Sequence, residues 1–251
     1  SVDAVLWRGG GDVDGDGFSE LAAGQDVALA GGTPGLYVFE HDGAVKPGWP
    51  RTDAASFGIP ALADCDEDGL LDIVVACQLN VNWTNPALRA YKGDGTPLWT
   101  REGPFDRVQP PAIGDLDNDG WPEIVASFYL SGGNQCRILA TRRDGSDFGA
   151  TIDVPEGRIV QNPPALGDVD GDGDMEIVFI AFKSSGTDNK MYVYHHDGTL
   201  AAGWPQICGT NWIVRPNTPR LVDTDGDGVL EIITAAYMEG IYGWRGDGTP
   251  L

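Results

Sequence analysis

Short apolar runs rich in β-branched residues recur along the chain. DIVVA begins at Asp72, EIVAS at Glu123, EIVFIAF at Glu176 and EIITAA at Glu231. Nowhere does an apolar period of 3.6 residues persist for ten residues, as an amphipathic helix would require. Short, continuously apolar and β-branched runs are instead typical of buried strands. The pattern therefore predicts an all-β fold.

Further strands are predicted on both sides of each apolar run. Segments such as PALAD (Pro60) and PALGD (Pro164) precede it and suit a short strand. Stretches such as YVF (Tyr37) and YVY (Tyr192) follow it, and their alternation predicts a third strand. Each stretch runs into Asp-Gly, which favours a tight hairpin turn and then a fourth strand. A bulky aromatic residue follows that turn in four copies, at Trp49, Trp99, Phe148 and Trp204.

An acidic segment between the first and second predicted strands marks a repeat. The first aspartates are Asp12, Asp64, Asp115, Asp168 and Asp223, at intervals of 52, 51, 53 and 55 residues. About 50 residues and four strands per unit match a propeller blade, because stacked blades can bury sheet faces that one sheet cannot. We predict a β-propeller of about five four-stranded blades, with one acidic loop per blade. It forms a single domain over residues 1–251, with repeats at approximately 1–50, 51–101, 102–154, 155–208 and 209–251.

The spacing at the two ends of the chain bears on ring closure. The aspartate of the Asp-Gly turn precedes the next first aspartate by 21 to 26 residues, and joining the two ends gives 16. We favour a closed five-bladed ring whose last blade is completed by residues 1–10. Five repeats cut from a longer propeller or array would have the same ends. Because the chain starts at Ser1 without an initiator methionine or signal-peptide pattern, we expect a mature, trimmed or excised segment.

Each acidic loop has the composition of a calcium site. Counted from the first aspartate, carboxylates stand at offsets 0, 2, 4 and 8 and glycine stands at offset 5. Four carboxylates in nine residues repel one another unless a cation lies among them, and hard oxygen ligands in that number favour Ca²⁺. The residue at offset 6 varies freely, as expected if only its carbonyl binds. We therefore predict about five Ca²⁺ ions. The predicted ligands are Asp12, Asp14, Asp16, Phe18 and Glu20; Asp64, Asp66, Asp68, Leu70 and Asp72; Asp115, Asp117, Asp119, Trp121 and Glu123; Asp168, Asp170, Asp172, Asp174 and Glu176; and Asp223, Asp225, Asp227, Val229 and Glu231.

The EF-hand is the nearest alternative, because its loop opens in the same way. An EF-hand needs a bidentate acid at position 12 and flanking helices. Position 12 is occupied here by Ala23, Val75, Ala126, Phe179 and Thr234. None of these is acidic and their neighbours are strand-like, so the EF-hand is excluded in all five copies. A solvated acidic turn remains an alternative for one loop, but not for five copies in register.

The pattern D-x-D-x-D-G-x-x-[DE]-[IL] between two strands resembles the FG-GAP/VCBS repeats of integrin α-chain propellers and bacterial surface proteins. The phrases PALGDVDGDG (from Pro164) and MYVYHHDGTLAAGWP (from Met191) are similar to the bacterial branch of that family. The resemblance covers essentially the whole chain and implies a calcium-loaded β-propeller on a secreted or cell-surface protein. It does not imply one activity, because members include adhesins, lectins and domains of polysaccharide-degrading enzymes. Integrin propellers have seven blades, whereas this chain has five repeats.

Charge and composition restrict the partners. The formal net charge is −22, from 38 acidic and 16 basic residues. Such a chain repels phosphate backbones and anionic membranes, so we expect no nucleic-acid binding. It has no run of 18 apolar residues, so we expect no membrane insertion. The resemblance to FG-GAP/VCBS proteins implies an extracellular or cell-surface location, and the expected partner is a protein or glycan ligand.

Outside the acidic loops, few residues suggest a catalytic or redox role. No HExxH motif, GxSxG motif or nucleophile–base spacing occurs, so we predict a protein that is not an enzyme. Cys65 reads as a small buried apolar residue. One disulfide among Cys77, Cys136 and Cys208 remains open. Our first hypothesis is a calcium-stabilised binding, adhesion or assembly module of open oligomeric state. The alternatives are a lectin propeller and the propeller domain of a polysaccharide-degrading enzyme.

Aromatic and arginine residues outside the repeat pattern are the candidates for ligand contact. They are Trp83, Phe105, Arg107, Arg158, Trp212 and Arg215. Such side chains stack on sugars or anchor protein partners. They equally well pack between neighbouring blades, and the sequence alone does not separate these roles.

Overall fold

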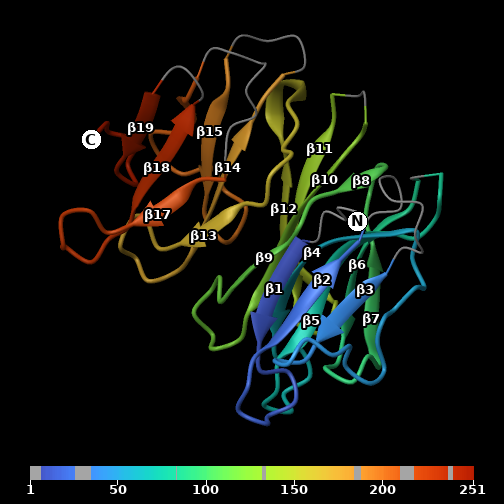
Figure 1. Ribbon diagram of the computed structural model, residues 1–251. Coiled ribbons are helices and arrows are strands. Elements are labelled where there is room, and N and C mark those ends of the chain that lie inside the picture. The colour runs from blue at the N-terminus through green and yellow to red at the C-terminus, as the bar shows by residue number, and fades with distance from the viewer. Residues whose placement is uncertain are drawn as a thin grey trace.

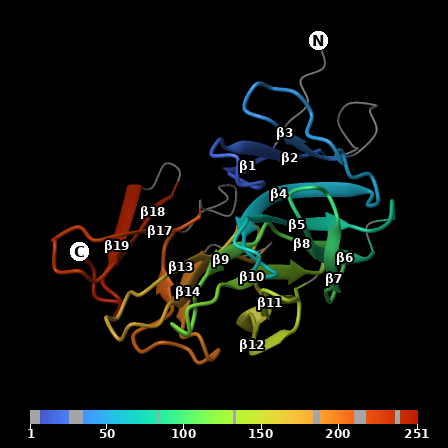
Figure 2. The same cartoon turned by 90° about the horizontal axis from the view of Figure 1, so that it is seen from below.

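The computed structural model describes residues 7–25, 35–82, 84–131, 134–183, 188–209, 218–236 and 240–251. Among these residues, antiparallel strands form five sheets, and the one helical element is the short 3₁₀ helix η2 (Pro155–Gly157). The sheets follow one another in chain order around the molecule (Figure 2). The predicted all-β fold is therefore confirmed.

The strands of each sheet are consecutive in the chain. The first sheet is β1 (Trp7–Gly11), β2 (Glu20–Gly24) and β3 (Leu36–Phe39), and the second is β4 (Ser56–Ala63), β5 (Asp72–Gln78), β6 (Pro86–Tyr91) and β7 (Pro97–Glu102). The third contains β8 (Arg107–Val108), β9 (Ala112–Gly114), β10 (Glu123–Tyr129), β11 (Cys136–Arg142) and β12 (Asp147–Asp153). The fourth is β13 (Ala165–Gly167), β14 (Glu176–Ala181), β15 (Lys190–Tyr194) and β16 (Gln206–Ile207). The fifth is β17 (Arg220–Val222), β18 (Glu231–Ala236) and β19 (Gly240–Trp244).

The antiparallel order brings two kinds of turn to the same end of every sheet (Figure 1). The acidic loop joins the first strand to the second, and Gly11 is paired with Glu20 where the loop begins and ends. The third strand runs back to this end and enters the Asp-Gly turn. We call this end of the sheets the loop end. The connections from second to third strand, and from one sheet to the next, lie at the opposite end.

The core lies between neighbouring sheets. In β5, Ile73 and Val75 belong to a buried cluster shared with the first sheet, whereas Val74 and Ala76 belong to one shared with the third. Two further clusters join the third sheet to the fourth and the fourth to the fifth. Successive side chains of a strand point to opposite faces. A strand covered on both faces is therefore continuously apolar, which explains runs such as DIVVA.

The predicted fourth strand is complete in only some sheets. It is regular in β7 and β12, but β16 has only two residues. In the first and fifth sheets the corresponding segment contributes isolated bridges, Phe39 to Val45 and Trp244 to Pro250. Both β8 and β9 pair with β10, so the first strand of the third sheet is split. Pro110 and Pro111 separate the two pieces, because proline has no N–H for the ladder. The five-bladed ring and its closure stay predictions.

All four cysteines are buried, and none of them forms a disulfide bond in the structure. The disulfide that the sequence left open is therefore absent from the structure. Burial raises the pKa of the Cys77 and Cys136 thiols to about 12, so both are protonated at neutral pH. Cys65 is 3% exposed and occupies the second position of its acidic loop, in agreement with its prediction as a small buried apolar residue.

Candidate metal centres

The first aspartate of each loop holds the loop backbone. Asp12 Oδ1 accepts a hydrogen bond from the N–H of Gly15 over 2.7 Å, and its Oδ2 accepts from the N–H of Gly17 over 3.0 Å. The same two-sided arrangement recurs at Asp64, Asp115, Asp168 and Asp223. Gly17 has a φ of 90°, a left-handed conformation that strains residues with a Cβ. The glycine at offset 5 is therefore required by the bend of the loop.

The acid at offset 4 closes the second half of the loop. Asp16 Oδ1 accepts the N–H of Phe18 over 2.8 Å, and Asp172 Oδ1 accepts that of Asp174 over 3.0 Å. The other copies have the same bond. These contacts use one oxygen of each carboxylate and leave the second oxygen for another partner.

The acid at offset 8 is buried at the base of every loop. Glu20 Oε2 accepts the N–H of Val13 over 2.9 Å, and Glu20 is 2% exposed. The same bond to offset 1 recurs at Asp72, Glu123, Glu176 and Glu231. The first residue of the second strand thus ties both halves of the loop together. The carboxylate replaces the ladder hydrogen bonds that the strands cannot make across the loop.

The loops gather carboxylate oxygens in the way that a cation would need. Oxygens of Asp12, Asp14 and Glu20 lie within 4.8 Å of one another, and the second and third loops group the same three offsets. The fourth loop groups Asp168, Asp170 and Asp172 in the same way. Three of these oxygens, Glu20 Oε1, Asp66 Oδ1 and Asp117 Oδ1, are buried and have no hydrogen-bond partner among the described residues. Buried polar atoms in native proteins are rarely unpaired. The donor set is all oxygen and suits Ca²⁺, which would supply the missing partner.

Burial and repulsion from the neighbouring loop carboxylates raise the pKa of three of the acids at offset 8. Burial raises the pKa of Asp72 to about 6 and that of Glu123 to about 7, and the neighbouring loop carboxylates add to both shifts. The N–H groups of Cys65 and Leu116 oppose these shifts. Burial also raises the pKa of Glu176. A divalent cation would reverse this balance, because it favours the ionised carboxylate.

Basic side chains from the same sheets contact the loops. Lys46 Nζ contacts Asp14 Oδ2 and lies 3.1 Å from Glu40 Oε1. Lys92 Nζ contacts Asp66 Oδ2 and lies 3.1 Å from Asp68 Oδ2. These cations offset part of the negative charge of the first and second loops.

These basic side chains were not predicted from the sequence, although their positions follow a pattern. The position two residues before the aspartate of the Asp-Gly turn is basic in four of the five copies, at Lys92, Arg142, His195 and Arg245. This position ends the third strand at the loop end, next to the acidic loop. In the first copy it is Glu40, and Lys46 takes the place of the cation.

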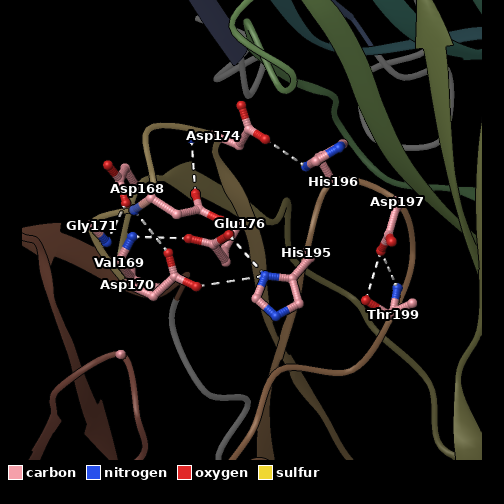
Figure 3. A network of polar contacts seen from close by, with 12 residues as sticks. Asp168, Val169, Asp170, Gly171, Asp174, Glu176, His195, His196, Asp197 and Thr199 are labelled. Carbon is pink, nitrogen blue, oxygen red and sulfur yellow. Dashed lines mark hydrogen bonds and ion pairs between the residues drawn. The ribbon is translucent and has the colours of Figure 1, made fainter.

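The fourth loop has a histidine in this position (Figure 3). His195 Nδ1 lies 3.2 Å from Glu176 Oε1 and 3.7 Å from Asp170 Oδ2. His196 Nδ1 lies 3.2 Å from Asp174 Oδ2, outside the loop. Asp170 and Glu176 therefore face the interior of the loop, whereas the Asp174 side chain is turned away from it. The backbone N–H of Asp174 still donates to Asp172, and the ligand role of the carbonyl at offset 6 stays a prediction.

In three loops the side chain at offset 6 contacts the Asp-Gly turn of its own sheet. Phe18 stacks on His41 with ring centroids 4.3 Å apart, and Arg143 lies over the Trp121 ring at 4.2 Å. With the contact of Asp174 to His196, these attach the first, third and fourth loops to their turns. In these three loops the residue at offset 6 and its partner in the turn differ together.

The structure gives different environments to the aromatic and arginine residues that the sequence suggested for ligand contact. Arg158 is fully buried, and its Nη2 lies 2.6 Å from Asp188 Oδ2, so it ties the connection between the third and fourth sheets to the segment that precedes β15. Phe105 packs against the core between the second and third sheets. Arg107 lines a hollow at the end opposite the loops. Trp83, Trp212 and Arg215 lie outside the described residues.

Comparison with sequence families identifies the repeat. A family model described as FG-GAP-like repeat matches residues 64–126, 115–179 and 168–234. Each match begins at the first aspartate of one loop and ends in the second strand of the next sheet. No curated protein sequence matches the chain.

Several solved structures are similar to the chain. The C-terminal domain of Pseudomonas aeruginosa PilY1 is 13% identical with a TM-score of 0.57, and the match covers 92% of this chain and 59% of that one. The chain therefore spans about three fifths of that domain, and at this identity the likeness concerns the fold alone. An exo-β-1,3-galactanase from Clostridium thermocellum is 12% identical, with a TM-score of 0.44 and coverage of 90% and 54%. An endo-arabinanase from Bacillus licheniformis is 10% identical, with a TM-score of 0.40 and coverage of 100% and 98%.

Proposed function

The chain belongs to the FG-GAP-like repeat family, and from this premise we propose that it is a calcium-stabilised β-propeller module that binds a protein or glycan ligand at the cell surface or outside the cell. The proposal includes about five blades with one Ca²⁺ in each loop. It assigns the module no catalytic role.

One observation carries the calcium assignment. Every loop has a buried acid at offset 8 with one oxygen bonded to the N–H at offset 1, and in Glu20 the other oxygen is buried without a partner. When bound, Ca²⁺ would neutralise the crowded carboxylates and link the two strands that flank the loop. The carboxylates at offsets 0, 2, 4 and 8 and the carbonyl at offset 6 would hold it.

The proposed location rests on the family and on the absence of a spanning helix. FG-GAP repeats are typical of extracellular or surface proteins. Within the described part of the chain, no helix has the length and apolar content needed to cross a bilayer. Extracellular calcium modules commonly bind at about 0.1–1 mM, the concentration range of Ca²⁺ outside cells.

The stoichiometry of calcium binding tests this function. Calorimetry on protein first treated with chelator and then titrated with Ca²⁺ is expected to give about five sites. Two sites or fewer would contradict one calcium in each blade. A Glu20→Gln variant is expected to lose one site, because it removes one of the loop's carboxylate oxygens, and the matched exposed variant Glu102→Gln is expected to lose none.

A further inference from the structure

Two adjoining hollows lie at the end of the sheets opposite the loops. The first, of about 350 Å³, is lined by the start of β4, the end of β5, β8 and residues 161–163. The second, of about 370 Å³, is lined by parts of β17, β18 and β19. Asn162 lines both hollows, so they adjoin at this residue. We call the two hollows together the inner groove.

Two buried side chains of the inner groove have unsatisfied oxygens. Gln78 is 4% exposed; its Nε2 donates to the carbonyl of Asp106 over 3.1 Å, but its Oε1 has no partner among the described residues. Thr234, also 4% exposed, has an unpartnered Oγ1 in the wall of the second hollow. Because buried polar atoms are seldom left unpaired, both point to a ligand in the groove.

The backbone is also irregular at the groove. The pairing of β4 with β5 shifts register between Phe57 and Pro60, which places an extra residue at Gly58 and Ile59. Both residues line the first hollow. A β-bulge of this kind turns side chains and backbone groups away from the ladder and is frequent beside binding sites.

The charge of the groove is opposite to that of the chain. Arg107 lines the first hollow and Arg220 the second, and none of the described lining residues is an aspartate or glutamate. This composition is unusual in a chain with 38 acidic residues and a net charge of −22. An arginine guanidinium offers paired donors that match a carboxylate. The groove is therefore suited to a ligand that carries carboxylates.

Four carboxamides surround the first hollow: Gln78, Gln109, Gln161 and Asn162. Each carboxamide both donates and accepts hydrogen bonds, as does each sugar hydroxyl. They come from three successive sheets and their connections and not from one strand edge, which an extended peptide would use. The arrangement favours an oligosaccharide over a peptide.

We propose that the inner groove binds an acidic oligosaccharide, with sugar carboxylates at Arg107 and Arg220 and sugar hydroxyls at the carboxamides. This inference rests on the proposed function, because it names the ligand class of that binding module. One arginine in each of two adjoining hollows fits a chain of several sugar units with repeated uronic acids.

Binding to defined oligosaccharides tests the proposal. The calcium-loaded chain would be titrated by calorimetry with hexamers of hyaluronan, oligogalacturonate and alginate, with neutral chitohexaose and hexaglutamate as comparisons. Free Ca²⁺ would be held constant by dialysis, because uronate chains also bind calcium. We expect at least one acidic hexasaccharide to bind at least about tenfold more tightly than chitohexaose, and more weakly as salt is raised. Failure of all three to bind, or equally tight binding of hexaglutamate, would overturn the proposal.

Variants separate this inference from the calcium function. The double variant Arg107→Gln/Arg220→Gln is expected to lose about tenfold or more in affinity for the best hexasaccharide while keeping its calcium stoichiometry. Arg137→Gln, at an exposed arginine of β11 paired with Asp153 over 2.7 Å, is the control and should bind normally. Unchanged affinity in the double variant would refute the assignment of the inner groove as the saccharide-binding site. Saccharide binding without calcium binding would instead contradict the proposed function and leave the groove in place.

Discussion

Trp49 donates its indole N–H to the carbonyl oxygen of Gly93 over 2.8 Å, and so joins the first sheet to the Asp-Gly turn of the second. Trp99 makes the same bond to Arg143, and Trp204 makes it to Gly246 over 2.6 Å. The recurring aromatic residue after each turn is therefore a connection between neighbouring sheets. Phe148 holds this position in the third sheet and has no N–H to donate.

Replacing Trp204 by phenylalanine should weaken the contact between the fourth and fifth sheets. The change leaves the buried carbonyl of Gly246 without its donor, which typically costs about 1–3 kcal/mol of unfolding free energy. Chemical denaturation with calcium present would measure the loss. Trp121→Phe is the control, because Trp121 is 40% exposed and lies at the surface of its loop. Equal stability of the two variants would argue against the role of the indole bond.

Gly246→Ala tests the close approach of the fourth loop to the fifth sheet. A Cβ built on Gly246 would lie 1.8 Å from the carbonyl oxygen of Val169, a backbone atom of the fourth loop. Relief of that clash requires the sheets to separate, and overpacking of this kind costs about 1–3 kcal/mol. Val81→Ala, at a side chain that is 76% exposed, is the control and should have little effect on the melting temperature. A fully stable Gly246→Ala protein would mean that the two sheets are not packed as described.

Removal of calcium should destabilise the whole chain. The four repeated carboxylate positions of the five loops hold 20 of the 38 acidic residues, and without a cation these carboxylates repel one another. A ligand at a hundredfold excess over its dissociation constant adds about 2.7 kcal/mol of stability per site. We therefore expect a chelator to lower the melting temperature by many degrees, and Mg²⁺ to restore it poorly. An unchanged melting temperature in chelator would contradict calcium as a structural ion.

Two acids of the fourth loop should behave differently. Asp170→Ala removes a carboxylate that faces the loop interior and should abolish calcium binding there, while the other four loops still fill, because repeat units contact mainly their neighbours. Asp174→Ala removes a side chain that contacts His196 and should leave all sites intact. Calorimetry would measure the calcium stoichiometry of both variants. Loss of several sites in Asp170→Ala would reveal strong coupling between the loops, and loss of none would refute the loop assignment. Met175, at offset 7 of the same loop, packs against the core between the third and fourth sheets, so its replacement would also disturb the core.

The connection between the third and fourth sheets should lose stability in acid. Hydrogen bonds from Lys190 and then Arg158 lower the pKa of Glu156 from 4.5 to about 2. Because the folded-state pKa is depressed, this contribution is present above about pH 4.5 and is lost as the pH falls towards 2. The difference in melting temperature between wild type and Glu156→Gln should therefore be largest above about pH 5 and vanish near pH 2. A difference that stays constant across this range would exclude the ion pair as its cause.

The sequence by itself determined the strands, the repeat and the loops. Runs such as DIVVA are continuously apolar because both faces of β5 are covered, and this signal is local. The loop pattern is also local, because Asp12 and Glu20 bond to backbone groups no more than seven residues away. Their spacing therefore contained most of the candidate site.

Only the tertiary structure decided which residues meet between sheets. Trp49 and Gly93 are 44 residues apart, and Asn162 lines two hollows with residues from β5 and β18. Such contacts depend on the angle and separation of whole sheets, which no short pattern records. The incomplete fourth strands have the same origin, because pairing at a sheet edge depends on the path of the chain after the turn. The repeat spacing determined the units of this protein, and the packing of one unit on the next determined its inner groove.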